Sequence, residues 1–124
     1  MRLRISHTTS YRYDQPVPYA LQQVRLRPKA HQNQRVLNWT LAVTGGRRET
    51  AFEDNHRNSV DLVSFDPGTT TLTLHVEGEV ETTDTAGVLG PHGGFNPLWL
   101  FDRQTALTRA GGAVRKLAAA VAGE

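Results

Sequence analysis

The sequence predicts an all-β protein, an antiparallel β-sandwich followed by a helical tail. Side chains alternate between apolar and polar along the first strand-like segment, as they do when a strand buries one of its faces. Similar short segments recur at regular spacing, separated by Gly, Pro, Asn and Asp turns, while helical periodicity is confined to the C-terminal end. This spacing is typical of an immunoglobulin-like sandwich with about six to seven strands.

The first three strands are expected in the basic half of the chain. Residues 2–13 alternate and should stop at Asp14–Pro18, where two prolines remove backbone donors. A second strand is expected over residues 21–27, ending at Pro28. A third contains an apolar row that should face the core (Leu37, Trp39, Leu41 and Val43) and ends at Gly45-Gly46.

Three more strands follow. Residues 47–53 give a weak signal, residues 54–58 are typical of an Asp/Asn turn, and residues 59–65 alternate up to an Asp-Pro-Gly turn. Residues 70–81 form the clearest strand, in which Gly78 interrupts the inward row and predicts a bulge. The inward row of this strand is Leu72, Leu74, Val76 and Val80.

The C-terminal part changes character. We expect a sandwich over residues 1–84, a Gly/Pro-rich linker with an apolar patch over 85–104, and a helix over 105–124. Thr108 is the expected cap of that helix, which should run to about Ala122. Its apolar positions recur at spacings of three and four residues: Leu107, Ala110, Val114, Leu117 and Val121.

Charge is unevenly distributed along the chain. Residues 1–48 carry most of the Lys and Arg, whereas residues 49–84 carry most of the Asp and Glu. Opposite charges on neighbouring strands stabilise a sheet modestly, so we interpret the two segments as complementary rather than as an anion-binding patch. No nucleic-acid partner is therefore expected.

The chemistry of a catalytic or metal site is missing from the sequence. The chain has no cysteine, and its serines lie outside any Gly-x-Ser-x-Gly motif. Asp54, His56 and Ser59 are close in sequence, but turn formation explains them better than a triad. The five histidines are scattered over different segments: His7, His31, His56, His75 and His92. We expect no catalytic residue, metal or cofactor, and hence no enzymatic activity of this chain.

The N-terminus enters a strand pattern directly, without the apolar stretch of a signal peptide. No run of about 18 apolar residues is present. These features predict a cytoplasmic protein that does not insert into membranes.

The motifs, taken in order, resemble the N-terminal region of bacterial transglutaminase-like proteins. The resemblance rests on a Tyr-x-Tyr pair and a Pro-Val turn in residues 11–17, a Leu-Arg-x-Pro motif in residues 24–28, and the Asp-Asn turn with its Val-rich strand in residues 54–60. Residues 72–80 are similar to the next strand of the family, and Leu107-Thr108 to its connection to the catalytic core. Arg57 stands where the family usually has glycine, which predicts a differently shaped turn.

The resemblance implies a non-catalytic sandwich that braces or flanks a papain-like domain with a Cys-His-Asp triad. The parent protein would be a cysteine protease, amidase or acyltransferase, and this chain an excised or truncated part of it that lacks the triad. The partner would be the catalytic domain of the same polypeptide. Four apolar residues are expected either to close over the sandwich edge or to dock on that domain: Phe95, Trp99, Leu100 and Phe101.

Two alternatives remain open at this point. A stand-alone immunoglobulin-like module would bind an acidic partner through an arginine-rich sheet face formed by Arg2, Arg4, Arg12, Arg25 and Arg27. A homodimer would pair two copies through an edge strand or the tail helix.

Overall fold

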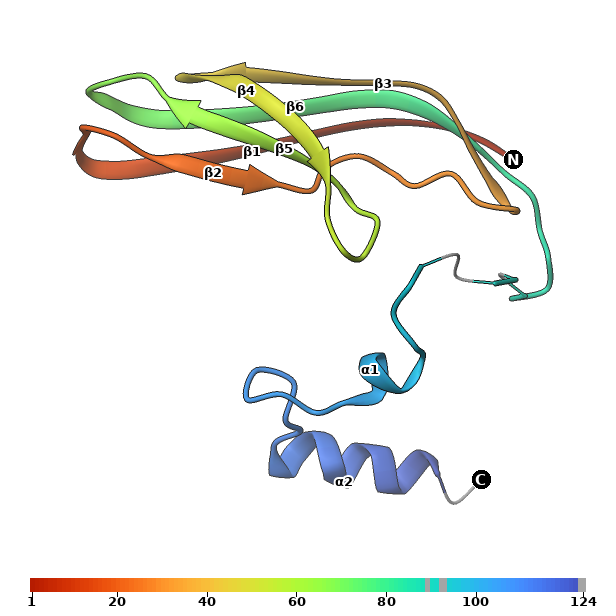
Figure 1. Ribbon diagram of the computed structural model, residues 1–124. Coiled ribbons are helices and arrows are strands. Elements are labelled where there is room, and N and C mark those ends of the chain that lie inside the picture. The colour runs from red at the N-terminus through yellow and green to blue at the C-terminus, as the bar shows by residue number, and fades with distance from the viewer. Residues whose placement is uncertain (89, 92–93, 123–124) are drawn as a thin grey trace.

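The computed structural model describes residues 1–88, 90–91 and 94–122 and contains two packed antiparallel sheets of three strands each (Figure 1). One sheet has the order β1-β6-β3, and the other has the order β2-β5-β4. This architecture confirms the predicted all-β sandwich. The strands are β1 (Arg2–Val17), β2 (Leu21–Val24), β3 (Gln34–Thr44), β4 (Gly46–Glu53), β5 (Ser59–Phe65) and β6 (Thr69–Thr82).

The hydrophobic core lies between the two sheets. Leu72 and Leu74 of β6 pack against Val63 and Phe65 of β5, and Val24 of β2 completes the cluster. Each of these side chains is buried, because the strand alternation turns every second residue toward the opposite sheet. The inward rows predicted for β3 and β6 are therefore confirmed.

β1 is longer than predicted. It continues through Pro16 to Val17, with a shift in its pairing with β6 between Arg12 and Val17. β1 is an edge strand, so the N–H that Pro16 lacks is not needed by a second neighbouring strand. The expected break at Asp14–Pro18 is therefore wrong for its first four residues.

β2 is shorter than predicted and ends at Val24. The following segment is held by side chains instead of a ladder: the indole Nε1 of Trp39 donates to the carbonyl of Leu26 at 2.8 Å. Arg27 turns toward Asp61 of β5. These contacts close one end of the sandwich without extending the sheet.

Gly78 marks a close approach and not a bulge in its own strand. A Cβ at this position would lie 2.4 Å from the carbonyl oxygen of Asn38 and 2.5 Å from the ring of Trp39. The irregularity lies in the partner strand, where the pairing of β3 with β6 shifts between Val36 and Asn38. Gly78 thus gives the large Trp39 ring its place against β6.

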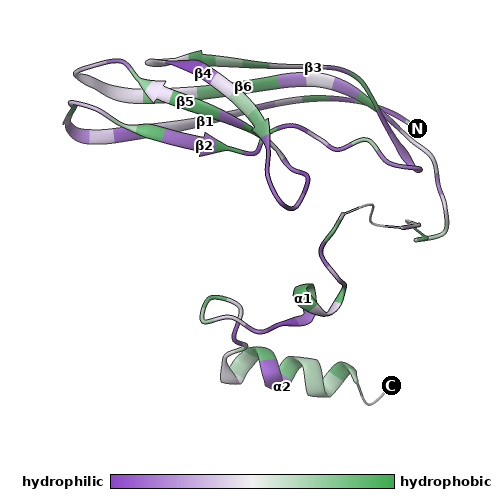
Figure 2. Cartoon of the chain, viewed as in Figure 1, coloured by the Kyte–Doolittle hydropathy of each residue, from purple (hydrophilic) through white to green (hydrophobic). Residues whose placement is uncertain are grey.

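The tail is the chain that follows β6, residues 83–122, and its described residues contain two short helices, α1 (Trp99–Asp102) and α2 (Gly112–Val121). α2 begins later than predicted: Gly111 occupies its N-cap, and Thr108 instead closes a turn with Thr105. α1 replaces part of the expected linker. Figure 2 shows hydrophobic residues along both helices as well as along the strands. No described helix has the length and apolar character needed to span a membrane.

Candidate functional site

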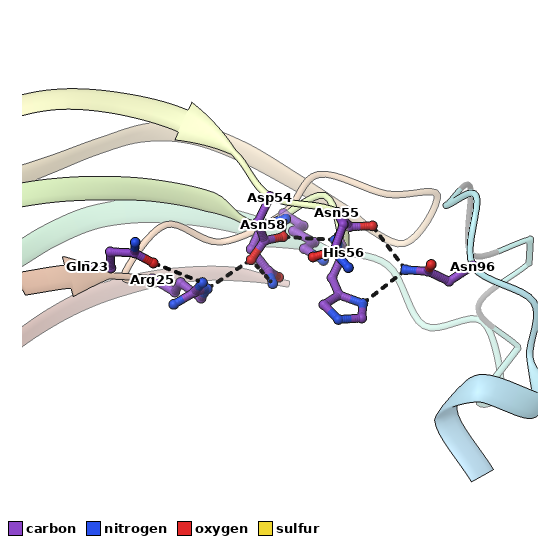
Figure 3. Close-up of polar contacts among 8 residues, drawn as sticks. Gln23, Arg25, Asp54, Asn55, His56, Asn58 and Asn96 are labelled. Atoms are coloured by element: carbon purple, nitrogen blue, oxygen red, sulfur yellow. Dashed lines mark hydrogen bonds and ion pairs between the residues drawn. The ribbon is translucent and has the colours of Figure 1, made fainter. Parts of the chain in front are cut away.

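The candidate site lies at the end of the sandwich where three segments meet (Figure 3). These are the β4–β5 loop (residues 54–58), the segment that follows β2 (residues 25–33), and the tail. We call this region the loop end.

Asp54 organises the β4–β5 loop. Its Oδ1 accepts the backbone N–H groups of His56 and Asn58 at 3.0 and 2.9 Å, and its Oδ2 accepts Nδ2 of Asn58 at 3.0 Å and Nε of Arg25 at 2.9 Å. The hydrogen bonds from Asn58, helped by Arg25 and the backbone of His56, hold the pKa of Asp54 well below its usual range. The carboxylate is fully engaged in the loop, which agrees with a turn and not with a catalytic triad.

Arg57 adopts the conformation that glycine favours. Its φ of 58° lies in the left-handed region, and its N–H donates to the carbonyl of Asp54 at 2.8 Å. This conformation is strained for a residue with a side chain. The hydrogen bonds that Asp54 accepts keep the loop in it. The backbone of the turn is therefore strained at Arg57, and the differently shaped turn expected from the resemblance stays a prediction.

The tail contacts the sandwich at this loop. Nδ2 of Asn96 donates to the carbonyl of Asn55 at 3.0 Å and lies 3.2 Å from Nδ1 of His56 (Figure 3). The ring centroid of Phe101 lies 5.8 Å from that of His56. The loop thus links the sandwich both to α1 and to the segment that precedes it.

Asp61 is a buried carboxylate that the sequence analysis missed. It is fully buried. Its Oδ2 accepts a hydrogen bond from Nε of Arg27 at 2.8 Å, and its Oδ1 accepts one from Nε of Arg48 at 2.5 Å. Burial raises the pKa of Asp61, but the hydrogen bonds and charges of the two arginines outweigh it, so the pKa lies below its ordinary value. The signal was in the sequence, since Asp61 shares the inward parity of Val63 and Phe65.

The apolar side chains predicted to dock are gathered on and around α1. Phe95 is 99% exposed, Trp99 is 64% exposed and Phe101 is 56% exposed, whereas Leu100 is half-buried. On α2, the apolar positions are exposed as well: Val114, Leu117 and Val121. The tail therefore presents an apolar surface to solvent.

The five arginines of the predicted charged face lie on different parts of the fold. Arg2, Arg4 and Arg12 are on β1, and Arg25 and Arg27 follow β2 in the other sheet. Three of them are in ion pairs, with Glu79, Asp54 and Asp61 respectively: Arg2, Arg25 and Arg27. Arg4 lies opposite Glu79 in the ladder, and Arg12 lies opposite Thr71.

Charge complementarity within the fold is confirmed. Besides those three pairs, Arg35 pairs with Glu81, and Arg47 and Arg48 pair with Glu49 and Asp61. Each joins the basic first segment to the acidic second one. Two of the three carboxylates of β6, Glu79 and Glu81, thus pair with an arginine, and Nε2 of His75 lies 3.6 Å from Oε2 of Glu77.

The histidines are dispersed. His7 and His75 hydrogen-bond Thr9 and Thr8 on the β1–β6 ladder, His31 bonds Asn33, and His92 lies outside the described residues. Within the part of the chain that the structure describes, no three His, Asp or Glu residues are grouped to hold a metal ion.

Comparison with known proteins gives a family assignment. Residues 3–81 match the family model described as bacterial transglutaminase-like N-terminal region. Neither the curated proteins nor the solved structures yield a match. The family match spans all six strands up to Glu81 and stops before the tail, so the similarity suggested for Leu107-Thr108 stays a prediction.

Proposed function

The chain belongs to the bacterial transglutaminase-like N-terminal region family, and from this we propose that it is a non-catalytic sandwich domain that braces or flanks a transglutaminase-like catalytic domain. The family resemblance implies that this catalytic domain is papain-like, carries a Cys-His-Asp triad, and acts as a protease, amidase or acyltransferase. The present chain has no cysteine to serve as its nucleophile.

One observation carries the proposal: large apolar side chains of the tail remain exposed beside a sandwich that already buries its own core. Phe95 and Trp99 leave most of their surface in water. Aromatic side chains are enriched in protein interfaces, where their burial contributes much of the binding energy. Asn96 and Phe101 attach this segment to the β4–β5 loop. The attached tail is therefore placed to present its apolar surface to a second domain.

The arginine-face alternative has less support. An arginine already paired with an internal carboxylate must give up that pair to bind an acidic partner, and three of the five are so paired. A titration with heparin at low and high salt tests this alternative directly, because polyanion binding weakens steeply with salt.

The proposed function is tested by titrating this chain with a transglutaminase-like catalytic domain that carries the triad. Calorimetry measures the affinity. Phe95→Ala and Trp99→Ala should weaken association at least tenfold. Phe52→Ala is the matched control, because Phe52 is an exposed aromatic residue on β4, and it should change the affinity less than twofold.

Absence of association, or equal losses for Phe95→Ala and Phe52→Ala, would contradict docking through the tail. Turnover of an amide substrate by the chain alone would contradict its non-catalytic role. Sedimentation of the chain alone separates docking from the homodimer, since a dimer lost in Trp99→Ala would show that the apolar surface covers a second copy instead.

A further inference from the structure

A pocket of about 400 Å³ opens at the loop end. Its walls come from residues 28–32 after β2, from residues in the 53–59 range around the β4–β5 loop, and from Pro91 of the tail. Small-molecule sites usually have volumes of this order. The pocket shares no lining residue with the apolar surface of the tail that the proposed function uses, although the two adjoin where the ring of His56 lies 5.8 Å from that of Phe101.

The loop that forms one wall is held in place from several sides. Nζ of Lys29 donates to the carbonyl of His56 at 2.8 Å, and the bonds of Asp54 fix the backbone around that carbonyl. Gln32 lies against Gly90 of the tail, where a Cβ would be 2.6 Å from Oε1 of Gln32. The pocket is therefore built from segments that are tied to one another and not from a single mobile loop.

Basic groups predominate in the pocket. Lys29 and Arg57 are cationic, His31 and His56 add two imidazoles, and Glu53 is the acid among the described lining residues. The ammonium of Lys29 has three N–H donors, so after its bond to His56 it retains donors for a ligand. Nε of Arg57 lies 3.6 Å from Oε1 of Glu53, in an exposed ion pair. The negative charge of Glu53 is thus balanced by Arg57, and the positive charge of Lys29 is left for a ligand.

Apolar groups complete the lining. Pro28, Ala30 and Pro91 add walls without hydrogen-bond donors, and the volume exceeds what a bare oxyanion occupies. Polar side chains make up most of the lining, so this pocket is more polar than the usual small-molecule site and the three apolar residues form only part of its wall. The ligand that fits combines one anionic group with a compact apolar body.

We propose that this pocket binds a small organic anion, a carboxylate or phosphate monoester carrying a compact apolar group, with Lys29 as its principal charge partner. The anion lies by the ammonium of Lys29, and the apolar body lies against the proline walls. This inference is independent of the proposed docking role, because it concerns the chain by itself.

The test is a titration of the isotope-labelled 124-residue chain, followed by amide and side-chain NMR shifts. Benzoate and phenyl phosphate probe the two anion chemistries, and benzyl alcohol is the uncharged control. We expect saturable shifts confined to residues 28–32 and 53–59 with at least one anion, and at least fivefold weaker binding of benzyl alcohol. Equal binding of the alcohol, or no saturable shift with either anion, would overturn the proposal.

Matched variants distinguish binding in this pocket from non-specific attraction of an anion to basic groups elsewhere on the chain. Lys29→Gln should weaken anion binding at least fivefold, whereas Lys116→Gln, the same change on α2, should alter it less than twofold. His31→Gln, compared with His75→Gln on the outer ladder, gives a second test in case Lys29→Gln unfolds the loop. Equal effects within both pairs would overturn the assignment to this pocket.

Discussion

The sandwich and the tail differ in the burial of their apolar side chains. In the sandwich, Val60, Val63 and Leu72 are completely buried between or beside paired strands. In the tail, both helices lack any buried residue, and Phe95 is almost completely exposed. The two regions belong to one chain of ordinary composition, so the difference lies in what each region packs against.

The difference shows which part of the molecule supports itself. Strands of the sandwich bury one another's apolar faces, and this burial stabilises them whatever else is present. α2 has only 10 residues, with Gly111 at its N-cap and Gly112 as its first residue, and isolated helices of this length are marginal in water. The helices of the tail therefore gain little stability from burial within this chain, and the proposed docking supplies the surface on which they would gain it.

The largest expected effect on stability is the difference between truncating a leucine in the sandwich and truncating one in the tail. Leu72→Ala removes a fully buried side chain and should lower the free energy of unfolding by about 3 kcal/mol. Leu117→Ala removes an exposed one from α2 and should change it by less than about 0.5 kcal/mol. Urea unfolding of both variants measures the contrast, and similar losses would mean that the tail packs as firmly as the sandwich.

The next effect concerns the buried charge. Asp61→Asn leaves Arg27 and Arg48 without their shared carboxylate, and since both arginines are partly exposed we expect a loss of about 2 kcal/mol. Glu81→Gln breaks the exposed pair with Arg35 and should lose less than about 0.5 kcal/mol. Thermal unfolding of the two variants provides the comparison, and a smaller loss for Asp61→Asn would show that Asp61 does not hold the sandwich end together.

A smaller effect of opposite sign is expected at Arg57. Arg57→Gly relieves the left-handed backbone at φ 58° and should stabilise the sandwich by about 1 kcal/mol, less what the exposed pair with Glu53 contributes. Chemical denaturation measures the gain. The control is Arg35→Gly within β3, where glycine relieves no strain and should destabilise; a loss at both positions would contradict the strain at Arg57.

The smallest effect is a change in acid sensitivity. Because the pKa of Asp54 is lowered in the folded chain, its contribution is fully present above the unfolded value of about 3.9 and is lost as pH falls through the folded pKa. Asp54→Asn should therefore make the acid decline of stability shallower, and Asn58→Ala should do so in part, because it removes the amide donor to that carboxylate. Unfolding curves recorded from neutral to acid pH test this, and an unchanged slope in Asp54→Asn would contradict it.

Much of the fold was predictable where local pattern and burial agree. The bounds of β5 and the inward rows of β3 and β6 follow from period-two alternation. The pattern failed at Pro16, because whether a proline breaks a strand depends on whether that strand is at an edge. It also failed at Thr108, where a turn with Thr105 competes with helix capping for the same hydroxyl.

The site was less predictable than the fold. The sequence singled out the Asp54 turn and the aromatic residues of the tail, but it gave no reason to expect that Asn96 would meet His56. It also placed Lys29 in an unremarkable polar loop. The pocket exists because residues far apart in the chain converge, and alternation carries no information on that convergence.

By itself the sequence determined the apolar inward rows of β3 and β6, that the chain is mainly strands, and which family it resembles, since these depend on local side-chain order. Only the tertiary structure decided the pairing of strands, the burial of Asp61 between two arginines, and the pocket beside Lys29. The physical reason is that pairing and burial are long-range: they depend on which surfaces meet once the two sheets have closed on each other.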